Sequence, residues 1–304
     1  MVYRTKIAAK EESKVENDTN IILYIKNNMG SFSKRQKMIG NYIIEHYDKA
    51  AYMTAAKLSE EVGVSESTVV RFSAELGFDG YQKLQRVLQE VTQAKLTAVQ
   101  RMEIASQRMG DRDVLTDVLE MDMDKIQKTL LEIDHDEFKK SVEILTKAKK
   151  IYIIGARSAA ALASFADFYF NLIFKDVKVI TSGGSDLFEQ ILRLESGDAV
   201  FGISFPRYSK STIKALDYAK EHGAYVIGLT DSINSPIVKA STHCLIARSD
   251  MNSFADSLVA PMSVINALIA AIGMNKKQEV SETLERLEHI WDVYGVYDKR
   301  SEEI

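Results

Sequence analysis

The chain has 304 residues, of which 46% are hydrophobic and 27% charged, and its formal net charge is −4. These values fit about two globular domains and exclude a strongly basic or acidic protein. The polar N-terminus lacks signal-peptide features, and the longest apolar stretch (260–274) is too short to cross a bilayer, so a cytoplasmic protein without a membrane partner is expected. The single cysteine, Cys244, excludes an internal disulfide, and five scattered histidines show no metal-ligand spacing.

The first 90 residues are predicted to be all-helical. Apolar periodicity indicates a short helix over 20–28, a second helix capped by Ser33 and a further helix over 81–92. The stretch 54–83 has the pattern of two short helices joined by a tight turn, which is typical of a helix-turn-helix. Such a motif places its second helix in the DNA major groove, so double-stranded operator DNA is the expected partner.

Within this stretch, Thr54 is placed to cap the first helix. Gly63 is placed to end that helix, where the exit often needs positive φ. Ser65 is placed to cap the second helix. Helical spacing predicts that the second helix turns Val69, Phe72 and Leu76 inward.

The outward face of the second helix then carries Ser67, Thr68 and Arg71, where a recognition helix contacts base edges and phosphates. The alternative is an ordinary helical hairpin with a solvated polar face, and charge does not decide between the two. Residues 29–90 hold eight basic and eight acidic residues, so one domain would bind a half-site weakly, which favours action as a dimer. The predicted DNA-contacting residues are Thr54, Ser65, Ser67, Thr68, Arg71 and Lys83.

Residues 91–149 are predicted to remain helical, with a break at Gly110. Met and Leu recur at helical spacing over 113–133, which favours packing in a core or against a partner helix. We expect this segment to connect two domains and to help form a homodimer or homotetramer. The predicted boundaries are 1–90 for the helix-turn-helix domain, 91–130 for the helical connector and 131–304 for the C-terminal domain.

From residue 150 the pattern changes to alternating strands and helices. Continuous apolar runs with β-branched residues are typical of strands buried on both faces of a sheet. Five such runs are 150–155, 177–183, 198–205, 224–230 and 242–248. Helices are predicted over 158–174, 186–194, 210–222, 253–272 and 279–294, the last two packing on the sheet or on a second subunit. The fold class is therefore α plus α/β, with a helical N-terminal domain and a doubly wound, mostly parallel C-terminal sheet.

In a doubly wound sheet, ligands bind beyond the carboxyl ends of the strands. The first four predicted strands end in hydroxyl, glycine and arginine residues, and hydroxyls with helix N-terminal amides hold phosphate or polyol oxygens. The sequence therefore predicts a pocket for a small phosphorylated ligand. The predicted ligand-binding residues are Arg157, Ser158, Thr181, Ser182, Ser204, Arg207 and Ser209.

Two alternatives compete with this pocket. Ser, Thr and Gly are common in helix caps and turns, so any one of these residues is well explained as a cap. A dinucleotide site is the second alternative, but Arg157 stands where a second glycine is needed after Gly155. Thr181 and Ser182 end the second strand in place of a ribose-binding acid. Both departures argue against NAD, and no cofactor is predicted.

With these features in place, residues 20–297 resemble the RpiR family of bacterial transcription regulators. That family joins an N-terminal helix-turn-helix to a C-terminal sugar isomerase (SIS) domain that binds phosphosugars. The segment LSEEVGVSESTVVRFSAELGFDGYQKL (58–84) matches the family's pattern closely. In the SIS part, Ser158 matches the serine of the family's Gly-x-Gly-x-Ser loop, and Thr181-Ser182-Gly183 resembles its hydroxyl-rich turn. The resemblance implies DNA binding and phosphosugar sensing.

Two loops depart from the family's pattern. Arg157 replaces the second glycine of the first loop. The third SIS loop commonly reads Ser-x-Ser-Gly-x-Thr; Ser204 and Ser209 match its ends, whereas Pro206 and Arg207 replace the Ser-Gly pair. The change removes a hydroxyl often used on phosphate and makes the turn bulkier. Arg207 either clamps a phosphate or signals a different acid or an unphosphorylated polyol.

A catalytic SIS isomerase needs a base near the pocket, usually Glu or His. The strand-end loops offer only Asp231 and Glu189, and the later segment offers Asp256, so no acid–base pair stands out. We therefore expect a sensor without enzymatic activity, with a SIS isomerase and a SIS module that only dimerises as alternatives. The expected function is a transcriptional regulator that controls carbohydrate-metabolism genes in response to a phosphosugar or related sugar metabolite.

Overall fold

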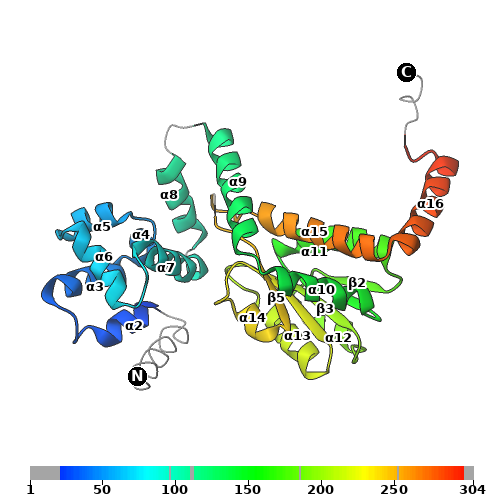
Figure 1. Cartoon of the computed structure of the whole chain (residues 1–304), viewed down its shortest axis with the longest axis horizontal. Coiled ribbons are helices and arrows are strands. Elements are labelled where there is room, and N and C mark those ends of the chain that lie inside the picture. The colour runs from blue at the N-terminus through cyan, green and yellow to red at the C-terminus, as the bar shows by residue number, and fades with distance from the viewer. Residues whose placement is uncertain (1–20, 96, 110–112, 185, 252, 298–304) are drawn as a thin grey trace, which may run out of the picture. The chain divides into compact units, whose positions relative to one another are not determined.

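The computed structural model of the chain describes residues 21–95, 97–109, 113–184, 186–251 and 253–297 (Figure 1). It has two compact units, residues 1–101 and 102–304. Two expectations, for the polar N-terminal segment 1–18 and for the helix break at Gly110, fall outside the described residues. The predicted boundaries at residues 90 and 130 stay a prediction.

The described part of the N-terminal unit is helical, as predicted. Its helices are Ile21–Asn28 (α2), Lys34–Glu45 (α3), Tyr47–Ala50 (α4), Ala55–Val62 (α5), Glu66–Glu75 (α6) and Tyr81–Lys95 (α7). Ser33 begins α3 with a capping box, in which its hydroxyl accepts the Gln36 N–H and the Gln36 side chain accepts the Ser33 N–H. One hydrophobic core joins these helices through fully buried side chains that include Ile25, Ile39, Leu58, Phe72 and Leu84.

The C-terminal unit is built on a five-stranded parallel sheet in the order β2-β1-β3-β4-β5. The strands are Ile151–Gly155 (β1), Val177–Ile180 (β2), Ala199–Ile203 (β3), Tyr225–Thr230 (β4) and His243–Ile246 (β5). All five lie within the predicted apolar runs, so the doubly wound α/β prediction is confirmed. This strand order has its switch point between β1 and β3, where such sheets bind ligands.

Helices cover both faces of this sheet (Figure 1). The helices that follow α7 are Ala98–Met109 (α8), Val114–Glu132 (α9), His135–Lys147 (α10), Ala159–Ile173 (α11), Leu187–Ile191 (α12), Lys210–Glu221 (α13), Pro236–Ala240 (α14), Val259–Asn275 (α15) and Lys277–Tyr294 (α16). One core packs α10, α11 and α15 against the sheet through residues such as Phe170, Phe201 and Ile265. The other core packs α12, α13 and α14 through residues such as Leu187 and Leu216.

Three details of the C-terminal unit differ from expectation. Only β1 and β3 are buried along their whole length, whereas β2 and β5 are mostly half-buried, because edge strands have a neighbour on one side alone. Helix α14 was not predicted, since it is a single short turn capped by Ser235. Helix α15 begins at Val259 rather than at Ser253.

Helix α9 turns polar side chains inward and apolar ones outward. Lys125 and Thr129 are buried, and the Thr129 hydroxyl accepts the Arg248 backbone N–H at 2.9 Å. Its exposed face carries four apolar residues at the 4-3-4 spacing of a helix–helix seam, with exposed fractions of 39% to 66%. These four residues, here named the α9 stripe, are Leu119, Met123, Ile126 and Leu130. Of the two predicted roles for this segment, core packing is therefore wrong for the stripe, and packing against a partner helix stays a prediction.

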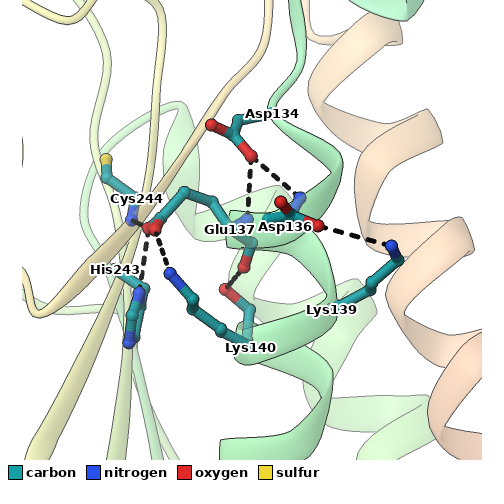
Figure 2. A network of polar contacts seen from close by, with 8 residues as sticks. Asp134, Asp136, Glu137, Lys139, Lys140, His243 and Cys244 are labelled. Carbon is teal, nitrogen blue, oxygen red and sulfur yellow. Dashed lines mark hydrogen bonds and ion pairs between the residues drawn. The ribbon is translucent and has the colours of Figure 1, made fainter.

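Helix α10 is tied to β5 by the carboxylate of Glu137 (Figure 2). Its Oε2 lies 2.9 Å from Nδ1 of His243 and accepts the Cys244 backbone N–H at 3.3 Å, while Lys140 donates to Oε1 at 3.4 Å. Burial alone would raise the pKa of Glu137, but the hydrogen bonds from His243 and Cys244 outweigh it, and the pKa is lowered. Asp134 caps the same helix by accepting two backbone N–H groups.

Among the described residues no single helix has the length and apolar character to cross a membrane. Helices α15 and α16, bent by 100° at their junction, meet that test as a pair by length and composition alone. Helix α15 packs in the core, where Ile265, Leu268 and Ile272 are fully buried. Helix α16 contacts α11 and α15, yet none of its residues, all of which are described, is buried.

Candidate DNA-binding and effector-binding sites

Helices α5 and α6 form the predicted helix-turn-helix. The Thr54 hydroxyl caps α5 by accepting the Lys57 N–H at 3.2 Å. Gly63 follows with a φ of 73°, in the left-handed region that favours glycine. Val64 is half-buried and packs against the core of this unit. The predicted cap at Thr54 and the predicted turn at Gly63 are confirmed.

Helix α6 turns Val69 and Phe72 into the core, as predicted. Ser65 occupies the N-cap position, but in the described part of the chain its hydroxyl forms no cap hydrogen bond to a backbone amide. Instead it lies 3.0 Å from the Ser67 hydroxyl and 2.8 Å from the Thr68 hydroxyl. The expected side-chain cap by Ser65 is therefore wrong. Its hydroxyl contacts the two neighbouring hydroxyls and not a backbone amide of the helix.

Thr68 is buried, with an exposed fraction of 9%, so its predicted place on the outward face is also wrong. It precedes the buried Phe72 by four residues, and residues at that spacing share one face of a helix. Of the residues predicted for the outward face, Ser67 and Arg71 are exposed there. Arg71 Nε donates to the Ser67 carbonyl at 3.2 Å, and Nη2 donates to the Ser67 hydroxyl at 3.3 Å. Val70, which is 42% exposed, adjoins them and was not predicted.

Basic side chains near the motif differ in how far they are neutralised. Lys83 pairs with Asp79 at 2.9 Å, and Lys57 pairs with Glu60 at 3.3 Å. Two cations at the start of α3, Lys34 and Arg35, are exposed and form no ion pair with any other residue that the structure describes. Lys83 therefore offers a DNA phosphate less uncompensated charge than the sequence suggests.

In the C-terminal unit, the loops after β1, β2 and β3 meet at one edge of the sheet. A Cβ atom placed on Gly183 would lie 3.6 Å from Ala156 Cβ, 4.0 Å from Ser209 Oγ and 3.0 Å from Ser211 Oγ. Gly183 belongs to the loop after β2, Ala156 to the loop after β1, and the two serines to the loop after β3 and the start of α13. The predicted convergence of these strand ends is confirmed, and we name this edge the rim.

The hydroxyls of the rim fall into two groups. Ser204 is buried and accepts the Ser209 N–H at 3.4 Å, while Ser209 caps α13 through the Thr212 N–H at 3.3 Å and lies 2.8 Å from the Ser211 hydroxyl. Ser209 is thus a helix cap, as the simpler alternative proposes. Ser158 occupies the N-cap position of α11 without a side-chain cap bond to any described residue. The exposed hydroxyl-bearing residues are Ser158, Thr181 and Ser182.

Arg157 and Arg207 adopt, at the rim, a backbone conformation that favours glycine. Their φ angles are 60° and 67°, and among the described non-glycine residues these two alone have positive φ. A non-glycine residue in this region costs about 1–3 kcal/mol. The extra bulk of the loop after β3 is accommodated because Arg207 is exposed. At Gly155, by contrast, a larger residue does not fit, because a Cβ there would lie 2.8 Å from the Ala159 carbonyl oxygen.

Hydrogen bonds fix the side chain of Asp231, which directly follows β4. Tyr208 Oη donates to Asp231 Oδ1 at 2.8 Å, and the Thr230 hydroxyl donates to the same oxygen at 3.1 Å. Asp231, a candidate base, is thus buried and already bonded, while Glu189 is exposed on α12. Tyr208 is not among the predicted residues, although it follows Arg207 directly in a strand-end loop.

Comparisons with known proteins match both units. The sequence model of the helix-turn-helix domain of the rpiR family matches residues 19–95, and that of the SIS domain matches residues 144–271. An uncharacterized HTH-type transcriptional regulator of Caldanaerobacter subterraneus is 26% identical over 279 residues, which cover 90% of this chain and 97% of the relative. The HTH-type transcriptional regulator HexR of Pseudomonas aeruginosa is 23% identical and covers 88% of this chain and 94% of its own.

Two solved structures share the fold. The sugar isomerase domain of an RpiR transcription factor from Sphaerobacter thermophilus is 28% identical with a TM-score of 0.55, covering 57% of this chain and 96% of that one. The NanR protein of Vibrio vulnificus, solved in complex with ManNAc-6P, is 21% identical with a TM-score of 0.57, covering 90% and 99%.

The helical motif and the α/β unit together define a helix-turn-helix transcriptional regulator with a sugar isomerase domain. The chain belongs to the RpiR family of such regulators, which confirms the resemblance found in its sequence.

Proposed function

We propose that this regulator binds a phosphosugar or related sugar metabolite at the rim and thereby changes its affinity for operator DNA. The observation that carries the proposal is the meeting of three hydroxyl-bearing loops at the switch point of the sheet, next to Gly183. NanR was solved with ManNAc-6P, so a phosphosugar is a ligand class that this fold accommodates. We further propose that the target genes serve carbohydrate metabolism and that the protein acts in the cytoplasm.

For DNA, we propose that α6 enters the major groove and that Ser67, Val70 and Arg71 reach the base edges. Val70 offers an apolar surface of the kind that contacts a thymine methyl group. Lys34 and Arg35 supply phosphate contacts, since both are exposed. Thr54 and Ser65 contribute from the N-terminal ends of α5 and α6, where they occupy the N-cap positions. Lys83 contributes less to phosphate binding than Lys34 and Arg35 do, because it pairs with Asp79.

We propose that the protein acts as a homodimer joined through the α9 stripe. Apolar side chains at 4-3-4 spacing are typical of a seam between two helices. The equal numbers of acidic and basic residues in 29–90 support the same conclusion, because one neutral domain binds a half-site weakly. A dimer doubles the contact and sets the spacing of two recognition helices on a roughly palindromic operator.

We propose a sensor without isomerase activity. Proton transfer between sugar carbons needs a base that is free to accept a proton within reach of the ligand. Asp231 Oδ1 already accepts two hydroxyl hydrogen bonds, and Glu189 faces solvent. An isomerase assay on the phosphosugars that bind is the direct check, and turnover above background would replace the sensor with an enzyme.

Thermal denaturation of the full chain against sugar phosphates, sugar acids and unphosphorylated sugars tests the sensor. A ligand at a hundred times its Kd stabilises the folded state by about 2.7 kcal/mol, which gives a readable shift in Tm. Ser158→Ala is the matched variant, because Ser158 is exposed and caps no helix through its side chain, so its loss leaves the fold intact. If a ligand raises the Tm of the wild type and Ser158→Ala reduces that increase, ligand binding at the rim is supported. If no ligand of the panel raises the Tm, the proposal is wrong.

Coupling between the two sites is tested on an operator selected from random DNA. Fluorescence anisotropy with and without the stabilising ligand measures whether operator affinity changes. Typical coupling between two sites is about 5- to 150-fold. An unchanged affinity would leave a sugar-binding protein that does not regulate through this ligand.

A further inference from the structure

The two arginines of the rim share an unusual backbone conformation, in the left-handed region of φ. Arg157 and Arg207 are the described non-glycine residues with positive φ, and each stands in a strand-end loop. Backbone strain of this kind persists where the surrounding structure enforces it, and it gathers at ligand sites. Glycine would avoid the strain at either position. The presence of a long cationic side chain at both positions therefore favours a role for the side chain in binding a ligand.

Neither guanidinium pairs with a carboxylate of the residues that the structure describes. The loops of the rim carry two acids, and both already have neutral partners. Asp186 accepts the Gln190 side-chain amide at 2.8 Å, and Asp231 accepts the Tyr208 hydroxyl at 2.8 Å. Lys210, exposed at the start of α13, adds a third cation to the two arginines. These neutral partners leave both carboxylates charged, so the three cations exceed the two acids of these loops by one, and neither arginine forms an ion pair with an acid that the structure describes.

The loops that carry the two arginines lie on either side of the switch point of the sheet. They follow β1 and β3, the neighbouring strands that flank the switch point. These loops approach closely, because Ala156 Cβ and Ser209 Oγ lie within 3.6 and 4.0 Å of one position, that of a Cβ on Gly183. A small molecule bound at the switch point thus lies next to both loops, each of which carries one exposed arginine.

We propose that the effector carries two anionic groups, a phosphate together with a carboxylate or a second phosphate, and that Arg157 and Arg207 each bind one of them. The inference rests on the proposed sensor function and adds the charge class of its ligand. A guanidinium forms paired hydrogen bonds with a carboxylate or a phosphate, and a planar donor set favours these anions over neutral hydroxyls. A sugar with one phosphate leaves one arginine without an anion.

Isothermal titration calorimetry on the full chain tests the proposal with four probes: glucose 6-phosphate, 6-phosphogluconate, fructose 1,6-bisphosphate and gluconate. We expect at least one of the two doubly anionic probes to bind at least tenfold more tightly than glucose 6-phosphate. Preference for 6-phosphogluconate assigns the second anion as a carboxylate, and preference for the bisphosphate assigns it as a phosphate. Equal binding of all three phosphorylated probes would overturn the inference.

The variants Arg157→Gly and Arg207→Gly remove the cations while suiting the observed φ angles, so neither strains the backbone. We expect each to weaken the preferred doubly anionic probe at least tenfold, and the double variant to lose its preference over glucose 6-phosphate. Arg193→Gln, at an exposed arginine outside the rim loops, is the control and is expected to bind as the wild type. Glycine variants that bind like the control overturn this inference while leaving the sensor standing.

The sensor proposal fails in a different way. If the wild type binds none of the four probes, the inference about charge is overturned. The sensor is then judged by the thermal panel of sugars, in which a shift with a singly charged or neutral sugar would still support it. If the panel is also silent, both proposals fall.

Discussion

Arg71 is the single cation of α6, and two hydrogen bonds to Ser67 lay its side chain along the helix. A guanidinium held in this way is partly ordered before it meets DNA, which reduces the entropy lost on binding. It lies beside Val70, so an apolar and a charged group share the outward face. Such a pair suits a site where a thymine methyl adjoins a guanine or a phosphate.

We expect Arg71→Ala to weaken operator binding about tenfold or more, because the loss of an arginine contact to DNA costs about 1–3 kcal/mol. Its Tm is expected to stay close to that of the wild type, since exposed substitutions usually change stability by about 0.5 kcal/mol or less. Fluorescence anisotropy on a selected operator measures the affinity. Lys83→Ala is the control with a smaller expected loss, because Lys83 pairs with Asp79. Full affinity of Arg71→Ala would remove α6 from the interface.

Cys244 is half-buried on β5, and burial of its thiol raises its pKa to about 12. Only the thiolate reacts readily, so at pH 8 almost none of the reactive form exists in the folded protein. We expect the disulfide reagent DTNB to leave the native protein unmodified over minutes and to titrate one thiol per chain in denaturant. Rapid modification of the native protein would mean that the β5 edge opens readily.

At the scale of elements, α10 and β5 are joined by a carboxylate that lies 106 positions from His243 in the sequence. The hydrogen bonds to Glu137 keep its pKa below the ordinary value of 4.5. The folded state therefore binds fewer protons at this group than the unfolded chain does in acid. The stability that Glu137 contributes is fully present above pH 4.5 and is lost as the pH falls through the lowered pKa.

We expect Glu137→Gln to lower the free energy of unfolding by about 1–2 kcal/mol at pH 7, because hydrogen bonds to a charged acceptor are lost. The difference from the wild type should shrink as the pH falls through the lowered pKa of Glu137, because the wild type then loses its charged acceptor as well. Urea unfolding at pH 7, 5 and 3 measures this. Glu143→Gln is the control, since Glu143 lies on the same helix in a well-exposed ion pair with Lys147. A difference that stays constant with pH would contradict the assigned role.

Local chemistry explains which elements were predictable. The cap at Thr54, the turn at Gly63 and the five strands follow from residues adjacent in the chain, and all were predicted correctly. The backbone of Arg157 and Arg207 was not predicted, because arginine does not favour positive φ. For α9, periodicity showed which residues share a face but not which face the rest of the unit covers.

At the scale of the whole molecule, the α9 stripe is the surface that a lone chain explains least well. A folded domain rarely leaves a row of four apolar side chains exposed along one helix without a partner. Helix α9 is also fixed to its own unit, through Thr129 to Arg248 and through the Glu132 carboxylate to the Arg248 guanidinium at 2.9 Å. A rigid helix that presents a ridge can bury that ridge against a second copy without rearranging its own core.

We expect the double variant Leu119→Lys and Met123→Lys to convert a dimer into a monomer, because two charges cannot be buried in an apolar seam without partners. The fold itself should persist, since both residues are more than half exposed in one chain. Size-exclusion chromatography with light scattering gives the mass, and anisotropy should show weaker operator binding by the monomer. Leu192→Lys is the matched control, because Leu192 is 70% exposed on another part of the same unit. A variant that stays dimeric would place the interface elsewhere, and a tetramer reduced to dimers would assign the stripe to one of two interfaces.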